Sequence, residues 1–207
     1  MSLYLYRKFR VIGTIVHELA HALTVKLCGG TIDDLDITSH VNHRGHYNLG
    51  HQIAISYAPL IVNTALAALL AKWAITMSPS GLPQTITSLT SGLIPVAITT
   101  IGLQVLALGV AFPIASAALP SYQDARNPFM TFHGQLKQLT LLRILVFPVA
   151  VVVLALCVVP LVFAYLRSRS LLLNLMSELA FGTAVLLQAT GLFVVIDPAA
   201  VLSALVG

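Results

Sequence analysis

Long apolar runs separated by short polar connections dominate the chain. A helix that spans a bilayer needs about 20 mainly apolar residues. The segments that meet this length are residues 6–28, 52–77, 91–117, 141–166 and 171–196. The pattern therefore predicts an all-α membrane protein with about five transmembrane helices.

The first two apolar segments are joined by the polar stretch "GGTIDDLDITSHVNHRGHYNLGH". Gly-Gly ends the first helix, and short runs of alternating residues surround "NHRG". Such alternation is typical of paired strands joined by a tight turn. We expect a short β-hairpin at the membrane face, with "NHRG" at or near its turn.

Composition supports a membrane location. Of 207 residues, 57% are hydrophobic and 9% are charged, with a mean hydropathy of +0.92, whereas soluble proteins carry about 25% charged residues. Because no linker or charge run divides the chain, residues 1–207 are expected to form one membrane-embedded domain. We expect a multi-pass integral protein of the cell membrane, in contact with the lipid bilayer.

The net charge of +4 does not indicate a nucleic-acid partner. Basic residues gather at the ends of apolar runs, as at Arg7, Lys8 and Arg10, or at Arg167 and Arg169. Lys and Arg at these places anchor helices to lipid headgroups. We therefore expect no binding of nucleic acid.

The stretch "TIVHELAHALT" at residues 14–24 places polar groups inside the first apolar run. His17 and His21 are four residues apart, so both imidazoles lie on one helix face and can reach one metal ion. In the H-E-x-x-H pattern two histidines hold Zn²⁺, and the glutamate, here Glu18, takes a proton from a zinc-activated water. The alternative is a pair of core histidines bonded to other helices, but ionisable residues within a membrane segment favour function.

A catalytic zinc site usually has three protein ligands, so a third must come from elsewhere. Each spanning helix reverses the side of the chain, which places the 29–51 and 118–140 loops on the same side. Asp124 is the only acidic residue of the second loop and is our first choice. It can instead cap a helix after "PSYQ" or pair with Arg126.

Histidines supply the other candidate ligands. His133 is the alternative metal ligand, followed by His51 and His46. The loop histidines fit no standard metal-site spacing, which is typical of an exposed hairpin.

Two further polar residues lie inside apolar segments. Asn63, within "SYAPLIVNTALA" at residues 56–67, can contact a substrate backbone or the oxyanion of the reaction, or can bond to another helix. Glu178 enters the membrane from the side of Arg167 and Arg169, opposite the expected zinc, and is expected to pair with arginine or Gln188.

These motifs resemble the core of the site-2 protease family of intramembrane zinc metalloproteases. "HELAHALTVKLCGG", a hairpin-like loop and "APLIVN" match the family's H-E-x-x-H helix, membrane-edge strands and G-P-x-x-N-like motif, over about residues 10 to 130. The resemblance implies His17 and His21 as ligands, Glu18 as general base and Asn63 as a substrate or oxyanion contact. Asp124 matches the family's aspartate by order and side, but "LPSYQDARNP" departs from its L-D-G pattern, as in a divergent, minimal member.

The predicted function is that of a zinc metalloendopeptidase, a hydrolase with one Zn²⁺ per chain. Its substrates would be transmembrane or membrane-proximal segments of partner membrane proteins. The alternative is a membrane transporter or sensor of zinc or another divalent metal. Glu18 separates the two, because hydrolysis needs a base beside the metal and metal passage does not.

Overall fold

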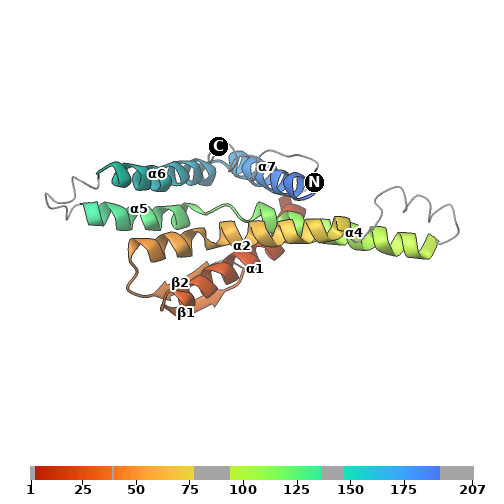
Figure 1. Ribbon diagram of the computed structural model, residues 1–207, viewed down its shortest axis with the longest axis horizontal. Helices are drawn as coiled ribbons and strands as arrows, with labels where there is room; N and C mark the ends of the chain where they lie inside the picture. The colour runs from red at the N-terminus through yellow and green to blue at the C-terminus, as the bar shows by residue number, and fades with distance from the viewer. Residues whose placement is uncertain (1–2, 39, 77–93, 137–146, 192–207) are drawn as a thin grey trace, which may run out of the picture.

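Figure 1 shows the computed structural model of the chain, in which long helices lie side by side along one axis. The structure describes residues 3–38, 40–76, 94–136 and 147–191. Its elements are α1 (Leu3–Leu27), β1 (Thr31–Asp36), β2 (His40–Arg44), α2 (Leu49–Thr76), α4 (Ile94–Ser116), α5 (Tyr122–Leu136), α6 (Phe147–Arg169) and α7 (Leu171–Ala189). The prediction of a mostly helical chain with a small antiparallel hairpin after its first helix is confirmed.

Helix α1 ends at the Gly-Gly pair, as predicted. Gly29 has a positive φ of 76°, a conformation in which a side chain would be strained. The N–H of Gly29 donates to Lys26 O, and the N–H of Gly30 donates to Val25 O. This Schellman arrangement satisfies the last carbonyls of α1 and turns the chain into β1.

The hairpin turns earlier than predicted. β1 and β2 pair antiparallel from Thr31 opposite Arg44 to Asp36 opposite His40, with an irregularity between Ile32 and Asp34. The placement of "NHRG" at the turn was wrong, because Asn42–Arg44 belong to β2. Asp36 explains the difference, since its Oδ1 accepts from both the N–H and the Oγ1 of Thr38 and so stabilises a turn directly after β1.

Small residues let α1, α2 and α4 approach closely. The centre of the bundle is formed by Ala67, Ala71, Ala111, Ile114 and Ala115. A Cβ on Gly13 of α1 would overlap the carbonyl oxygen of Pro113 on α4. Such contacts are typical of helix packing in membranes, where van der Waals fit replaces hydrophobic exclusion.

The stretch predicted as a loop over residues 118–140 contains α5 instead. In Figure 1, α4 and α5 follow one another along the long axis with a non-helical break at residues 117–121, and α6 and α7 do the same across Ser170. Ser121 opposes further unwinding because it caps α5, as described below. The polar 78–88 stretch, and the ends of several predicted helices, lie outside the described residues.

Two helices in the described ranges, α2 and α7, are long and apolar enough to cross a membrane. The sequence led us to expect five. Helix α1 differs from the expectation for a physical reason, since Arg10, Glu18 and Lys26 interrupt its apolar run. The part of α4 from Ile101 to Ser116 is apolar but shorter.

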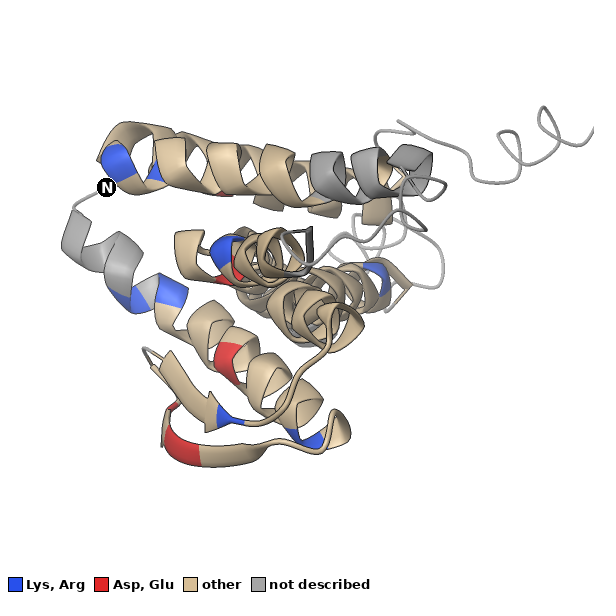
Figure 2. Cartoon of the chain, turned by 90° about the vertical axis from the view of Figure 1, so that its left-hand side faces the viewer, with Lys and Arg blue, Asp and Glu red and all other residues tan. Residues whose placement is uncertain are grey.

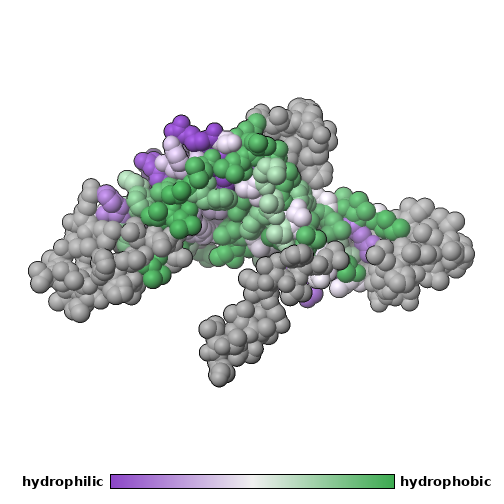
Figure 3. Space-filling view, turned by 90° about the horizontal axis from the view of Figure 1, so that it is seen from above, coloured by the Kyte–Doolittle hydropathy of each residue, from purple (hydrophilic) through white to green (hydrophobic). Residues whose placement is uncertain are grey.

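The described surface is poor in charge. Lys, Arg, Asp and Glu are sparse on the helices (Figure 2), and apolar residues cover much of the face seen in Figure 3. Large hydrophobic side chains on the outside of α7 include Leu171 at 62% and Leu172 at 69% exposure. An apolar surface of this extent favours contact with lipid or protein over water.

We expect Gly13→Ala to destabilise the bundle, because the added methyl group has no space against Pro113 O and forces α1 away from α4. Overpacking of this kind costs about 1–3 kcal/mol. Thermal unfolding in detergent should show a lower transition temperature. Gly109→Ala is the matched control, since nothing lies within 4 Å of a Cβ there, and it should be neutral or slightly stabilising; equal effects of both changes would contradict the close approach.

Candidate metal centre

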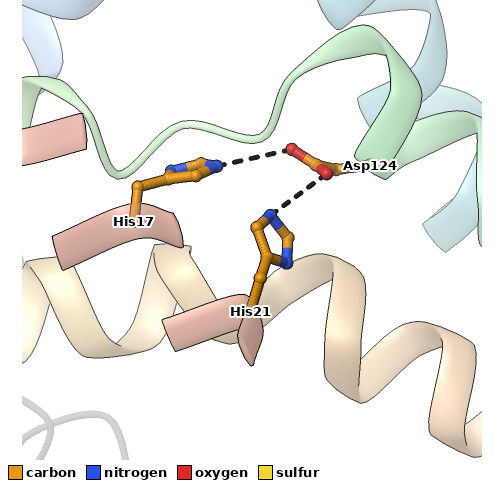
Figure 4. Close-up of side chains that lie close together, drawn as sticks. All are labelled: His17, His21 and Asp124. Carbon is orange, nitrogen blue, oxygen red and sulfur yellow. Dashed lines mark ion pairs between the residues drawn. The ribbon is translucent and has the colours of Figure 1, made fainter. Parts of the chain in front are cut away.

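His17 and His21 lie one turn apart on α1, and both are buried. Their rings meet edge to face, with centroids 4.9 Å apart. Figure 4 shows both rings directed toward Asp124, which comes from α5 on the other side of the site. The i, i+4 spacing thus brings two imidazoles to one place, as predicted.

Each imidazole is oriented by a distant backbone carbonyl. His17 Nδ1 lies 2.7 Å from Ala117 O, at the break between α4 and α5, and His21 Nδ1 lies 2.8 Å from Ile55 O on α2. A carbonyl oxygen only accepts, so each Nδ1 carries the proton and donates it. The Nε2 atom of each neutral ring is then left with a lone pair, the state in which histidine binds a metal.

Asp124 is held by the first turn of α5. The backbone N–H of Ser121 donates to Asp124 Oδ2 at 2.8 Å, and the N–H of Asp124 donates to Ser121 Oγ at 3.2 Å. This reciprocal pair is a capping box, in which two otherwise unpaired N–H groups at a helix start are satisfied. Asp124 is therefore a helix cap, the alternative left open by the sequence, while its carboxylate also faces the histidines.

The carboxylate of Asp124 lies opposite both Nε2 atoms. Oδ1 is 3.1 Å from His21 Nε2, and Oδ2 is 3.6 Å from His17 Nε2 (Figure 4). Ligand atoms at 2.0–2.1 Å from a tetrahedral zinc ion lie roughly 3.3 Å from one another. One ligand atom from each of the three residues falls within 4.8 Å of the others, so the group could hold a metal ion.

The chemistry of these atoms also fits a cation. Burial by itself raises the pKa of Asp124, but when the Nε2 atoms of His17 and His21 carry protons, their hydrogen bonds and positive charge outweigh burial and hold the pKa well below its usual range. A charged carboxylate facing two nitrogen lone pairs is repulsive unless a proton or a metal ion lies between them. The donor set of two imidazoles and one carboxylate matches that of catalytic zinc sites, which keep a fourth position open.

Glu18 lies between two cavities that meet at this centre. One cavity has a volume of about 520 Å³ and extends toward α6 and α7; the other has about 420 Å³ and extends toward β2 and α2. Glu18 and His17 line both cavities, although Glu18 is only 7% exposed. A molecule in either cavity can therefore approach the carboxylate of Glu18.

Asn63 lies apart from this centre, in contacts between helices. It is fully buried, and its Nδ2 donates to Gly13 O on α1 and to Ile114 O on α4. These bonds match the alternative in which Asn63 links helices, and Asn63 does not line either cavity. Its role as a substrate or oxyanion contact stays a prediction.

The alternative histidine ligands do not join the group among the described residues. His133 is exposed on α5 and stacks on Phe129. His46 and His51 follow β2, and the N–H of His51 donates to Asn48 Oδ1. The ligand group remains His17, His21 and Asp124.

Glu178 pairs with arginine, as predicted, through Arg10 at 3.0 Å and Arg167 at 3.3 Å. The expectation that Arg167 lies opposite the metal centre was wrong, because its Nη1 donates to Pro120 O and it lines the larger cavity. The reason is that the start of α7 and the end of α6 lie against the break at 117–121.

Sequence reasoning left open that Asp124 caps a helix, but it missed the reciprocal part of Ser121 in the capping box and the two backbone acceptors. The box has a local signal, since "SYQD" at 121–124 fits the [ST]-x-x-[DE] pattern that marks a helix start. The backbone acceptors have no local signal in the sequence, because Ala117 O, for example, is 100 residues from His17 in the chain.

No protein-family model, curated protein or solved structure matches the chain.

We expect the purified protein to bind one zinc ion per chain, and His17→Ala and His21→Ala to lose it, because each change removes one of the three facing ligand atoms. Asp124→Ala should also lose most of the zinc. Metal content after gel filtration, measured by mass spectrometry, is the readout.

His133→Ala is the matched control, because it removes an exposed imidazole from the same helix as Asp124. Its zinc content should equal that of the parent. Zinc retained by Asp124→Ala but lost by His133→Ala would identify His133, and not Asp124, as the third ligand.

Proposed function

We propose that this protein is an intramembrane zinc endopeptidase and a divergent, minimal member of the site-2 protease family. The observation that carries the proposal is the arrangement of three ligands around one point beside Glu18. Two Nε2 atoms, fixed by Nδ1 bonds to Ala117 O and Ile55 O, face the Asp124 carboxylate. A pair of core histidines would not require an anion opposite both lone pairs.

Zinc, when bound, supplies a Lewis acid that lowers the pKa of a water molecule and polarises a carbonyl group. The protein contributes the remaining parts of the reaction. Glu18 acts as general base: its carboxylate accepts the proton from the attacking water and passes it to the leaving amine. His17, Glu18 and His21 are each at most 8% exposed, so their charges act in surroundings less polar than bulk water.

The smaller cavity is the proposed place for the peptide to be cut. Its walls include His40, Val41 and His43 of β2 and Ser56 of α2. A peptide bond within a helix is shielded by its own hydrogen bonds, so a transmembrane substrate must unwind locally before it is cut. An unwound segment can pair with a strand of the hairpin, which holds it extended at the metal centre.

A multi-pass arrangement in the cell membrane is part of this proposal. It is supported by the candidate spans α2 and α7, and by the low charge and exposed apolar side chains of the other helices. The partners are then membrane-protein substrates and the surrounding lipid. Arg10, Glu18 and Lys26 on α1 would be accommodated next to the polar cavities and at the helix end rather than in lipid.

A membrane transporter or sensor of zinc is the second candidate. It is favoured by one observation, the presence of His40 and His43 on the wall of the smaller cavity, where they could pass a metal to His17 and His21. This candidate requires ligands but no base.

We expect Glu18→Gln to retain zinc and lose cleavage, because the amide keeps the size of the side chain but cannot accept a proton. General-base catalysis contributes about 10²–10⁴-fold, so cleavage of a membrane-embedded substrate in liposomes should fall by that factor. Bound zinc is measured in the same samples.

Lys72→Gln is the control, since Lys72 is exposed on α2 and lines neither cavity; this change should leave cleavage intact. Equal cleavage by the parent and Glu18→Gln at equal zinc content rules out the mechanism. Absence of cleavage together with zinc flux across the liposomes assigns the site to the second candidate.

A further inference from the structure

The larger cavity, of about 520 Å³, connects the metal centre with a group of arginines. One wall is a face of α1 that carries Arg10, Thr14, His17 and Glu18 at helical spacing. The opposite wall contains Arg167 at the end of α6. The proposed reaction involves the Glu18 end of this cavity and leaves the arginine end without a role.

Two arginine side chains meet on one carboxylate at the arginine end of the cavity. Arg10 Nη2 and Arg167 Nη2 both contact the same oxygen of Glu178, Oε1, at 3.0 and 3.3 Å. Asn174 Nδ2 also donates to this oxygen, at 3.0 Å. Two guanidinium groups therefore share one carboxylate oxygen at the end of the cavity away from Glu18.

Arg10 is the arginine that a ligand can reach. Arg167 is only 6% exposed and is held by Pro120 O and Asn174 Oδ1, so it forms part of the framework. The side chain of Arg10 is 43% exposed, and it contacts Glu178 through Nη2. A guanidinium has five N–H donors in a planar fork that matches a carboxylate.

The distance from Arg10 to the metal centre determines how many residues of an extended peptide would lie between them. Arg10 and His17 are seven residues apart on α1, which corresponds to about 10 Å along the helix axis. An extended peptide advances about 3.3 Å per residue. When the reacting carbonyl of an extended peptide lies at the metal centre, the residue three positions further along the peptide therefore lies beside Arg10.

We propose that Arg10 forms a specificity subsite for a carboxylate about three residues from the cleaved bond. The distance to the bond rests on the proposed function, while the preference for an anion rests on the exposed guanidinium of Arg10 in the cavity wall. The carboxylate can be an Asp or Glu side chain within the substrate or the free C-terminal carboxylate of a short tail.

Binding without cleavage tests the subsite. The protein carrying Glu18→Gln, with zinc bound, is titrated against hexapeptides labelled with an uncharged fluorophore, and fluorescence polarisation gives Kd. One pair of amidated peptides differs only by an internal Glu or Gln; a second pair, free of acidic side chains, differs only by a C-terminal carboxylate or carboxamide.

We expect one carboxylate peptide to bind roughly three- to tenfold more tightly than its amide partner, as for a charge-assisted bond at a partly exposed group. The pair that shows the preference identifies the source of the carboxylate. Adding Arg10→Gln should abolish the preference, and Arg10→Lys should restore part of it, because the charge returns without the planar fork.

Lys72→Gln is the matched control, because it removes an exposed positive charge on α2 that lines neither cavity; it should keep the preference. Equal Kd values within both pairs, or a preference that survives Arg10→Gln, overturn the subsite. Failure of the protease assignment would instead appear as absent cleavage by the parent protein while the binding preference persists.

Discussion

The site depends on one electrostatic constraint, which is that two nitrogen lone pairs and a carboxylate point at the same small volume. His17 and His21 cannot turn away, because each Nδ1 is bonded to a carbonyl oxygen of another helix or of the break after α4. Asp124 cannot turn away without breaking its contact with Ser121. The packing of α1, α2, α4 and α5 therefore holds together groups that repel one another until a cation lies between them.

The break between α4 and α5 makes this arrangement possible. In a continuous helix Ala117 O would accept from a backbone N–H four residues later, whereas at the break it accepts from His17 Nδ1. The same break exposes Pro120 O to Arg167 and ends at Ser121, which caps α5. One irregular stretch of five residues thus serves a histidine, an arginine and a helix cap.

Local sequence patterns predicted the parts of the structure that depend on residues close together in the chain. The spacing of His17 and His21, the end of α1 at Gly-Gly and the hairpin all follow from short-range rules. Bonding of Asn63 to another helix was one of two alternatives left open by the sequence, but its acceptors could not be predicted, because both are about fifty residues away. The position of Arg167 was missed because the count of membrane crossings assumed that consecutive helices reverse direction, whereas α6 and α7 follow one another along the long axis (Figure 1).

Asp124 has two duties, since the same carboxylate caps α5 and faces the histidines. In the proposed metal centre, metal occupancy and the winding of the first turn of α5 are therefore thermodynamically linked. A bound ion that holds the carboxylate opposes fraying of that turn, and fraying withdraws a ligand from the ion. Because such coupling is reciprocal, each process alters the equilibrium of the other by the same free energy. Local opening of α5 can be observed by amide hydrogen exchange. It would then report whether a metal ion occupies the centre that α5 shares with α1.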